Sequence, residues 1–295
     1  ERGTELAGTF LYTCGVLAYY DNNVIEALAY FDRSAQYRAQ DHDVELTTNE
    51  AYRMWFAFVH YFRALIQKNW GELSEALHEI EQSAKLLETR IGEFLTPVTK
   101  AEILSYIIGD ERRCRAELQG LLNRITELEN AAVNQGKKLD ANQTRLRTRM
   151  LVLLGNTYFV ANEFSDALNQ FKLALQFSPN DYYALASAAQ CYKKLGDGPS
   201  AEHFKRCLDL IERSGDFRRK RETIVRAVIA ALAAHAAHGC SDHLRYEQYA
   251  REARDLLSGD LAVDGLLPKF FSPATKRLVS AGELLTEVEL LSGSG

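Results

Sequence analysis

Apolar residues recur three and four residues apart along most of the chain, with polar residues between them. Clear helical segments cover 224–237 and 243–257, and two more lie between 98 and 128, separated at Gly109-Asp110. A further segment, 52–67, is rich in aromatic residues. Because no run alternates apolar and polar residues in the manner of a β-strand, the pattern predicts an all-α fold.

The clearest single pattern lies between residues 151 and 179. Its recurring positions are Leu151, Leu154, Gly155, Tyr158, Ala167, Phe171, Ala174 and Pro179. The small residues allow two helices to approach closely, and the larger ones fill the space between them. Ser178-Pro179-Asn180-Asp181 ends the second helix, because proline cannot continue a helix and Asn and Asp favour turns and caps. The segment therefore predicts two antiparallel helices.

The same internal offsets appear elsewhere in the chain. One repeat length further on stand Leu185, Ala188, Ala189, Tyr192, Ala201 and Leu208, with a turn at Gly196-Asp197-Gly198-Pro199. In this copy Phe204 comes one place early and Lys205 occupies the position of Phe171. Fainter copies carry Leu11, Cys14, Gly15, Ala18, Ala27, Phe31 and Ser34, and then Trp70, Gly71, Ala76, Ile80 and Ser83. Two adjacent units in register predict a repeat protein.

This spacing resembles the tetratricopeptide repeat (TPR), whose pattern is W-x2-L-G-x2-Y, A-x3-F and P over about 34 residues. Leu151 stands where that family prefers Trp. The resemblance is specific over residues 148–211 and looser elsewhere. It implies an α-solenoid, a right-handed superhelix of degenerate helix-turn-helix repeats, with binding rather than catalysis as its use. A hydrophobic fraction of 46% and only five prolines suit packed helices.

Two polar or helix-breaking stretches predict the domain organisation. Residues 131–144 read as a long loop between irregular repeats at 1–130 and clearer repeats at 145–258. The second stretch begins at 259 and is followed by a predicted amphipathic helix over 274–291, which would cap the solenoid or dock a partner. The start at Glu1 and the final Ser-Gly-Ser-Gly predict a fragment of a larger protein with an added tail.

The family resemblance also implies where a partner binds. In TPR folds the first helices of the repeats line a concave groove. The predicted groove residues are Tyr12, Tyr19, Tyr20, Arg149, Asn156, Phe159, Tyr183, Gln190, Lys193, Lys194, His235 and His238. Asn156, Gln190 and His235 would form a ladder that holds the backbone of an extended peptide; the alternative is that they are ordinary solvated helix residues.

Two further details narrow the predicted ligand. Members of the family that clamp a terminal carboxylate use Lys and Asn, and here Val152 stands where the clamp Lys would be, although Asn156 matches. The sequence therefore argues against a carboxylate clamp. The tyrosines of the amino-terminal groove, with Phe58 and Tyr61 beside them, favour an apolar or helical ligand, unless these rings form core.

One cluster has the composition of a metal site. His235, His238, Cys240 and His243 lie close in sequence, and His and Cys are zinc ligands. Paired Cys motifs are absent and His243 begins a different helix, so we predict neither a metal nor a cofactor. Histidines facing the groove would instead make binding depend on pH. The sequence holds no Gly-rich phosphate loop, GxSxG or HExxH motif, and we predict a protein that is not an enzyme.

Charge, hydropathy and cysteine usage restrict the partners and the compartment. The net charge of −5 argues against a general nucleic-acid binder. Basic clusters at 145–149 and at 218–226 would meet an acidic partner or phosphates, or simply face solvent, as we expect of Glu75 and Glu79. No run reaches the roughly 18 apolar residues of a membrane span. Five scattered cysteines without a CxxC motif predict a reducing, cytoplasmic setting.

These observations predict a protein- or peptide-binding scaffold or adaptor that assembles a complex or senses a partner. One alternative is a regulatory domain of a larger effector that senses a small peptide or metabolite. The other is an RNA-binding helical repeat, which requires the two basic clusters to share one concave face.

Overall fold

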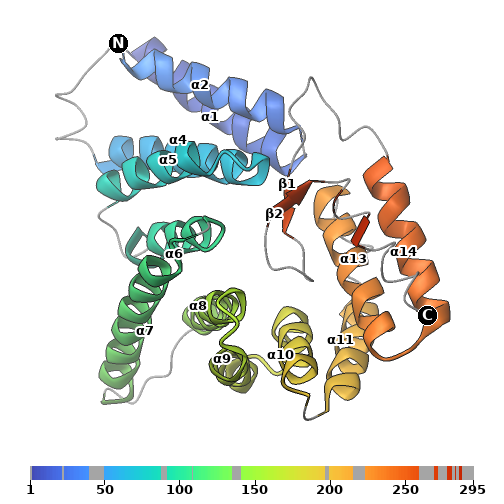
Figure 1. Ribbon diagram of the computed structural model, residues 1–295. Coiled ribbons are helices and arrows are strands. Elements are labelled where there is room, and N and C mark those ends of the chain that lie inside the picture. Colours follow the sequence, from blue (N-terminus) through green and yellow to red (C-terminus); the bar gives the residue numbers. More distant parts are fainter. Residues whose placement is uncertain are drawn as a thin grey trace. The chain divides into compact units, whose positions relative to one another are not determined.

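A computed structural model describes residues 2–21, 23–39, 50–87, 92–107, 109–134, 141–196, 199–214, 223–258, 269–271, 278–280, 283 and 286–287. Helices joined by tight turns make up nearly all of this part of the chain (Figure 1). By their internal contacts the residues form two compact units, Glu1–Ile103 and Leu104–Gly295.

The first unit consists of two helix pairs and the start of a further helix. Its helices are α1 (Arg2–Tyr20), α2 (Val24–Ala39), α4 (Glu50–Trp70), α5 (Leu73–Leu86) and most of α6 (Gly92–Ser105). α1 packs along α2, α4 packs along α5, and α2 contacts α4. A buried serine ties each pair together in the same way: Ser34 donates to the carbonyl oxygen of Gly8 at 3.0 Å, and Ser83 donates to that of Ala57 at 2.8 Å. The two faint sequence copies are therefore equivalent structural repeats.

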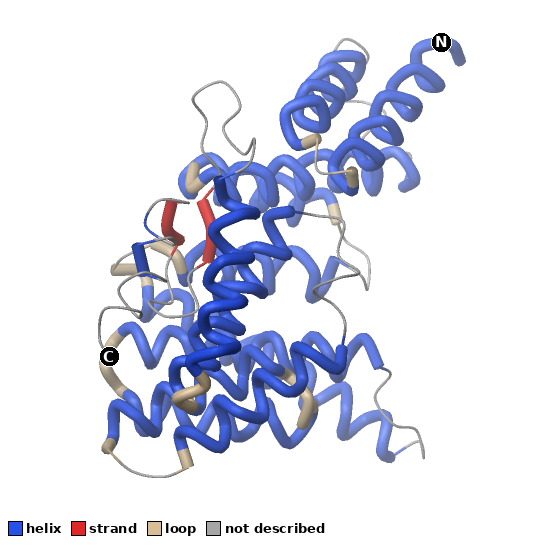
Figure 2. The backbone as a smooth tube through the Cα atoms, turned by 90° about the vertical axis from the view of Figure 1, so that its right-hand side faces the viewer, coloured by secondary structure: helices blue, strands red, loops and turns tan. Residues whose placement is uncertain are grey.

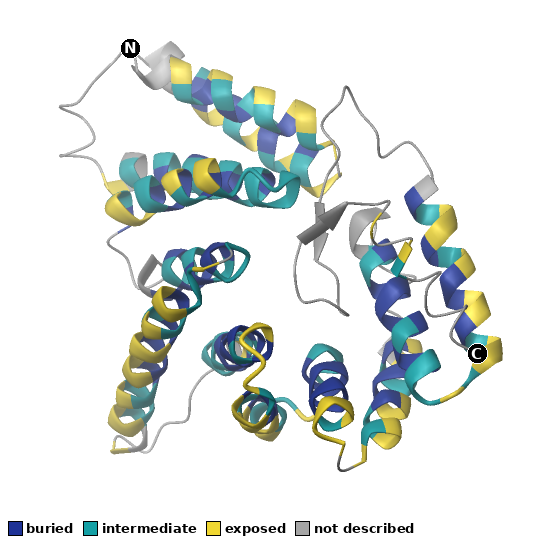
Figure 3. Ribbon diagram, in the orientation of Figure 1, coloured by how far each residue is buried: buried dark blue, intermediate teal, exposed yellow. Residues whose placement is uncertain are grey.

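The second unit continues with helices packed in sequence order. They are α7 (Glu111–Asn134), α8 (Ala141–Val160), α9 (Phe164–Phe177), α10 (Tyr182–Leu195), α11 (Ser200–Ser214), α13 (Thr223–Gly239) and α14 (His243–Ser258). Each helix packs against the next, and α10 also touches α8. α7 alternates buried and exposed positions along its length, whereas α13 is buried over most of its length (Figure 3). The predicted all-α solenoid of stacked helix pairs is confirmed.

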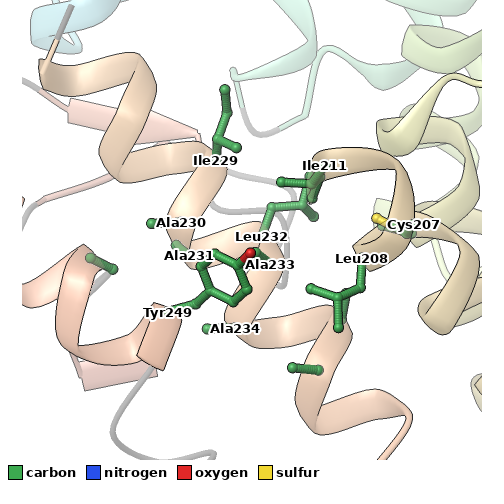
Figure 4. Packing of buried hydrophobic residues seen from close by; sticks show 14 of the residues in the cluster. Cys207, Leu208, Ile211, Ile229, Ala230, Ala231, Leu232, Ala233, Ala234 and Tyr249 are labelled. Atoms are coloured by element: carbon green, nitrogen blue, oxygen red, sulfur yellow. The ribbon is translucent and has the colours of Figure 1, made fainter. Parts of the chain in front are cut away.

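The largest buried cluster shows how small residues bring these helices together. The alanine-rich segment Ala230–Ala237 of α13 packs between α11, through Leu208 and Ile211, and α14, through Tyr249 (Figure 4). Alanines with essentially no exposed surface let the helix backbones approach closely, and the larger side chains of the neighbours fill the space. The apolar stretch that the sequence shows in this helix is therefore a packed internal element.

Close contact between a glycine and a phenylalanine recurs in the repeats. A methyl group on Gly15 would lie 2.7 Å from Cε1 of Phe31, and one on Gly155 would lie 2.5 Å from Cε1 of Phe171. In the following repeat, Phe204 is buried against Gly239 of α13, and Lys205 is exposed. The phenylalanine that came one place early in the sequence thus serves in the packing, and the lysine does not.

The turns between paired helices share one conformation. Gly71, Asn162, Gly196 and Ser241 have positive φ angles of 79°, 62°, 69° and 60°. After α8, the Glu163 amide donates to the Tyr158 carbonyl at 2.9 Å and the Asn162 amide to that of Phe159 at 3.0 Å. This is the Schellman pattern, which satisfies the last carbonyl groups of a helix. Aligning the repeats on this turn includes the pair α13–α14, and Ala234 is then the residue equivalent to Gly155.

Ser241 is the residue least suited to its turn, which leads to a prediction. Serine pays a steric cost in the left-handed region that glycine avoids. We expect Ser241→Gly to raise the free energy of unfolding by about 0.5–1 kcal/mol. Urea denaturation followed by circular dichroism measures the change. Asn162→Gly is the matched control. Its free energy of unfolding should rise less, because asparagine tolerates this conformation. A lower free energy of unfolding in Ser241→Gly would contradict the steric cost assigned to Ser241.

Two segments differ from the sequence prediction. Both ends of the loop predicted at 131–144 are helical, because α7 continues to Asn134 and α8 begins at Ala141; residues 135–140 lie outside the described part of the chain. Arg147 of α8 bonds Glu129 and Thr126 of α7, so packing continues across the predicted boundary, and the division between the units lies at 103 instead.

The second difference concerns the predicted closing helix over 274–291. Its residues Leu278–Ser280 form strand β2, which pairs antiparallel with β1 (Lys269–Phe271) (Figure 2). The helix prediction is wrong at this point. Val279 is opposite Phe270 in the pairing, and β-branched and aromatic residues suit a strand ladder better than a helix. Glu283 and the pair 286–287 are helical, and the rest of the predicted helix lies outside the described residues.

Candidate partner-binding surface

Three polar side chains that the sequence predicts to form a ladder stand at equivalent places on α8, α10 and α13. Gln190 of α10 and His235 of α13 meet directly, with 2.9 Å between their Nε2 atoms. An amide nitrogen can only donate, so the imidazole Nε2 accepts and carries no proton in this arrangement. The edge of the His235 ring also meets Phe204, with 5.4 Å between ring centroids. Two of the three ladder residues are therefore brought together.

Asn156 stands one repeat earlier on α8 and is 8% exposed. Its Oδ1 atom has no hydrogen-bond partner among the residues that the structure describes. A buried carbonyl oxygen without a donor costs about 1–3 kcal/mol relative to one that is paired. This oxygen is therefore a buried polar atom of the predicted ladder that lacks a donor among the described residues.

Positive charge collects at the carboxyl-terminal end of α10. Lys193 and Lys194 are exposed, and within the described part of the chain neither forms an ion pair. His238 is close to them: desolvation lowers its pKa, and the positive charge of Lys193 and the neighbouring His243 lower it further. His238 is therefore neutral near pH 7, and an anionic group placed beside it would raise its pKa again.

The other predicted residues of this region differ in accessibility. Arg149 is half-buried. Tyr183 is half-buried against Tyr182, with 4.7 Å between ring centroids, and desolvation raises the pKa of its hydroxyl. Phe159 is packed into the core with Phe164, at 5.2 Å between centroids, and with Ala167. Phe159 is therefore too deeply buried for a partner to contact more than the edge of its ring.

The predicted amino-terminal aromatic face is mainly core. Tyr12 packs against Phe31 and Trp55, each at 6.1 Å between ring centroids, and burial raises its pKa. Tyr19 meets Phe62 at 5.3 Å. Tyr20 alone of the three predicted tyrosines is largely open, with 58% of its surface exposed. The alternative of structural aromatic packing therefore holds for Tyr12 and Tyr19.

The repeated features now identify the kind of protein. The fingerprint spacing recurs along the chain, the glycine–phenylalanine contact joins α1 to α2 and α8 to α9, and a turn residue with positive φ follows α4, α8, α10 and α13. These helix pairs have the fold of tetratricopeptide (TPR) repeats. Stacked repeats of this kind present extended surfaces for binding.

Comparisons with known proteins give distant TPR neighbours and no family model that matches the chain. Over 135 residues it is 27% identical to Superkiller protein 3 of Saccharomyces cerevisiae, covering 43% of this chain and 9% of the yeast protein. PilF of Pseudomonas aeruginosa is 14% identical, with 88% of this chain and 96% of that chain covered and a TM-score of 0.47. Yeast Sti1, solved as a TPR2AB-domain:pHSP90 complex, is 16% identical, with coverage of 96% and 98% and a TM-score of 0.28. The chain thus spans a small fraction of the curated relative.

The histidine and cysteine side chains that suggested zinc do not converge. His235 bonds Gln190, His238 lies against the ring of Tyr246, and Cys240 donates to the Ala237 carbonyl. His243 begins α14 and is exposed. Across the described residues there is no group of three or more His, Cys, Asp or Glu that is arranged to hold a metal ion.

The basic clusters are partly used in packing within the TPR stack. Arg147 pairs with Glu129 and lies over the ring of Phe177 at 4.4 Å, and Arg226 pairs with Glu252 at 3.9 Å. Arg145 is exposed, and the predicted cluster at 218–221 lies outside the described residues. None of the helices described here is long and apolar enough to span a membrane.

Sequence reasoning misassigned one acidic side chain. Glu79, expected to face solvent, is 6% exposed and sits between α4 and α5. Its carboxylate accepts from His60 Nδ1 at 2.6 Å and pairs with Arg63 Nη2 at 3.1 Å. A signal was available, since His60 and Arg63 lie three residues apart on α4 and present two donors to the facing helix.

Proposed function

We propose that the surface formed by α8, α10 and α13 binds an extended segment of a protein partner, so that the chain acts as a scaffold or adaptor rather than as an enzyme. The observation that carries the proposal is the Gln190–His235 hydrogen bond, with the Asn156 acceptor, unpaired among the described residues, one repeat away. Polar groups repeated on successive first helices match the repeating amide groups of an extended peptide backbone.

The lysines beside this ladder indicate the character of the bound segment. Lys193 and Lys194 are exposed without acidic partners in the described residues, and His238 next to them is held neutral. An acidic side chain of the partner would meet this positive charge, which speeds association and supplies specificity. The proposed ligand is therefore an extended, acidic protein segment.

The test exchanges the surface charge and leaves the fold intact. Lys193→Glu/Lys194→Glu should reduce retention of partner proteins from cell lysate at least tenfold, because two attractive contacts become repulsive. Lys205→Glu is the control: it reverses the charge of one exposed lysine on α11, a helix that carries none of the three ladder residues. Quantitative mass spectrometry of the retained proteins is the measurement, with melting temperature checked for each variant.

The outcomes separate the alternatives. Retention that is equal in all three proteins would contradict the proposed surface. If no protein is retained and a small peptide or metabolite raises the melting temperature instead, the sensing alternative holds. Recovery of RNA with the wild type would favour the RNA-binding alternative.

We also propose that the protein works in a reducing compartment, the cytoplasm. All five cysteines are free thiols, and Cys114, Cys191 and Cys207 are buried as small core residues. Burial raises the pKa of the Cys114 thiol to about 12, which keeps it unreactive. These features support a setting in which cysteines serve as packing residues.

A further inference from the structure

The residues one helical turn beyond the ladder differ in character from one repeat to the next. Residues four apart in a helix lie on the same face. Val160 of α8 therefore continues the face of Asn156, and 41% of its surface is exposed. Lys194 of α10 continues the face of Gln190 in the same way and is also exposed. The ladder is thus bordered by an apolar side chain on one helix and by a positive charge on the next.

The neighbouring positions strengthen this contrast between α8 and α10. Phe159 is 9% exposed and packs in the core, so Val160 supplies the accessible apolar surface of α8. Lys193 is exposed and adds its charge to that of Lys194. The equivalent position on α13 is Gly239, where a methyl group would meet the ring of Phe204, so α13 presents no side chain there.

The distance between the two helices sets a spacing along a bound segment. α8 and α10 are in contact. Axes of packed helices lie about 8–10 Å apart, and an extended chain advances about 3.3 Å per residue. A segment that crosses from α8 to α10 therefore advances by about three residues between the two contacts.

We propose that Val160 and the pair Lys193–Lys194 set the register of the bound segment, which carries a large apolar residue about three positions from an acidic one. This inference rests on the proposed function, in which an extended acidic segment of a partner protein lies on the ladder. An apolar side chain over Val160 leaves water, whereas an acidic side chain gains a charge partner only over the lysines. A segment with the wrong spacing satisfies one contact and loses the other.

The test finds the preferred segment without assuming its sequence. A phage-displayed library of random peptides is selected on the immobilised intact chain, and the retained peptides are identified by sequencing. Peptides enriched by wild type should share an apolar residue and an acidic residue about three positions apart. A fluorescent copy of one such peptide should bind Val160→Lys about tenfold more weakly, because a charge then faces its apolar side chain.

Three variants assign each half of the motif to its residues. Val160→Lys should select an acidic residue in place of the apolar one, because α8 then carries the same charge as α10. Lys193→Glu/Lys194→Glu should select a basic residue in place of the acidic one and keep the apolar one. Leu173→Lys is the matched control: Leu173 is 39% exposed on α9, which carries no ladder residue, and this variant should select the wild-type motif.

The outcomes separate this inference from the proposed function. If wild type enriches acidic residues with no apolar residue at a fixed distance, the register is wrong and the proposed function stands. If wild type and Lys193→Glu/Lys194→Glu enrich the same peptides, or neither enriches any, both fail. A motif that matches a segment of this chain would assign the surface to an intramolecular contact and overturn the partner as its source. A dimer in sedimentation velocity that Val160→Lys abolishes would overturn it in favour of a second copy.

Discussion

Replacing Gly155 with alanine should lower the free energy of unfolding of the second unit by about 3 kcal/mol, the upper range for overpacking a core. The new methyl group would lie 2.5–2.8 Å from three atoms of the Phe171 ring, which has no exposed surface. α8 and α9 must then move apart or Phe171 must leave its rotamer. Urea denaturation monitored by hydrogen exchange of this unit measures the loss.

A glycine in the same unit provides a control of opposite sign. Gly120 lies in the interior of α7, and a methyl group there meets nothing within 4 Å. Gly120→Ala should therefore raise the free energy of unfolding by about 1 kcal/mol, through helix propensity alone. Adding Phe171→Leu to Gly155→Ala should restore part of the loss, so that the two changes are not additive. Equal effects of Gly155→Ala and Gly120→Ala would contradict the close contact.

Replacing Glu79 with alanine should destabilise the first unit by a similar amount, about 3 kcal/mol, because it breaks a buried ion pair from one side. His60 and Arg63 would lose their shared acceptor while keeping only 14% and 23% of their side-chain surface in water. Arg63 also holds Asp32, at 3.4 Å from its Nε atom, so the effect extends from α4 and α5 to α2. Thermal unfolding by differential scanning calorimetry measures the change.

Glu81 on the same helix supplies the comparison. Its carboxylate is 40% exposed and pairs with Lys100 at 3.4 Å, so Glu81→Ala should cost less than about 1 kcal/mol. Glu79→Gln keeps the shape of the side chain and one acceptor oxygen. Its loss of stability should lie between those of the two alanine variants. If Glu79→Ala and Glu81→Ala lower the stability of the first unit by the same small amount, the buried network of Glu79, His60 and Arg63 does not stabilise that unit.

The candidate site was predictable only in part. The repeat offsets place Asn156, Gln190 and His235 on equivalent positions, and the structure joins the last two by a hydrogen bond. The repeat offsets did not show which aromatic side chains are exposed. Phe159, Tyr12 and Tyr19 pack in or against the core, whereas Tyr20 is exposed to solvent. An aromatic ring on a first helix has the same sequence spacing whether it points to solvent or to a neighbouring ring, so spacing cannot settle its exposure.

Residue spacing along the chain was enough to predict the repeat architecture. The spacing of small and large apolar residues, such as Gly155 with Phe171, works within one helix pair, and turn residues such as Gly71 and Gly196 act over four or five positions. These are local constraints, and a short stretch of sequence contains all the residues that satisfy them. The helix pairs and their stacking order therefore follow from the spacing of residues along the chain.

The positions that another helix covers could be identified only from the packing of segments distant in sequence. Glu79 is buried because His60 and Arg63 of a different helix surround it. The strand pair at 269–280 likewise depends on pairing between two segments rather than on the periodicity of either. Burial is a property of what lies opposite a residue, and that partner is distant in sequence.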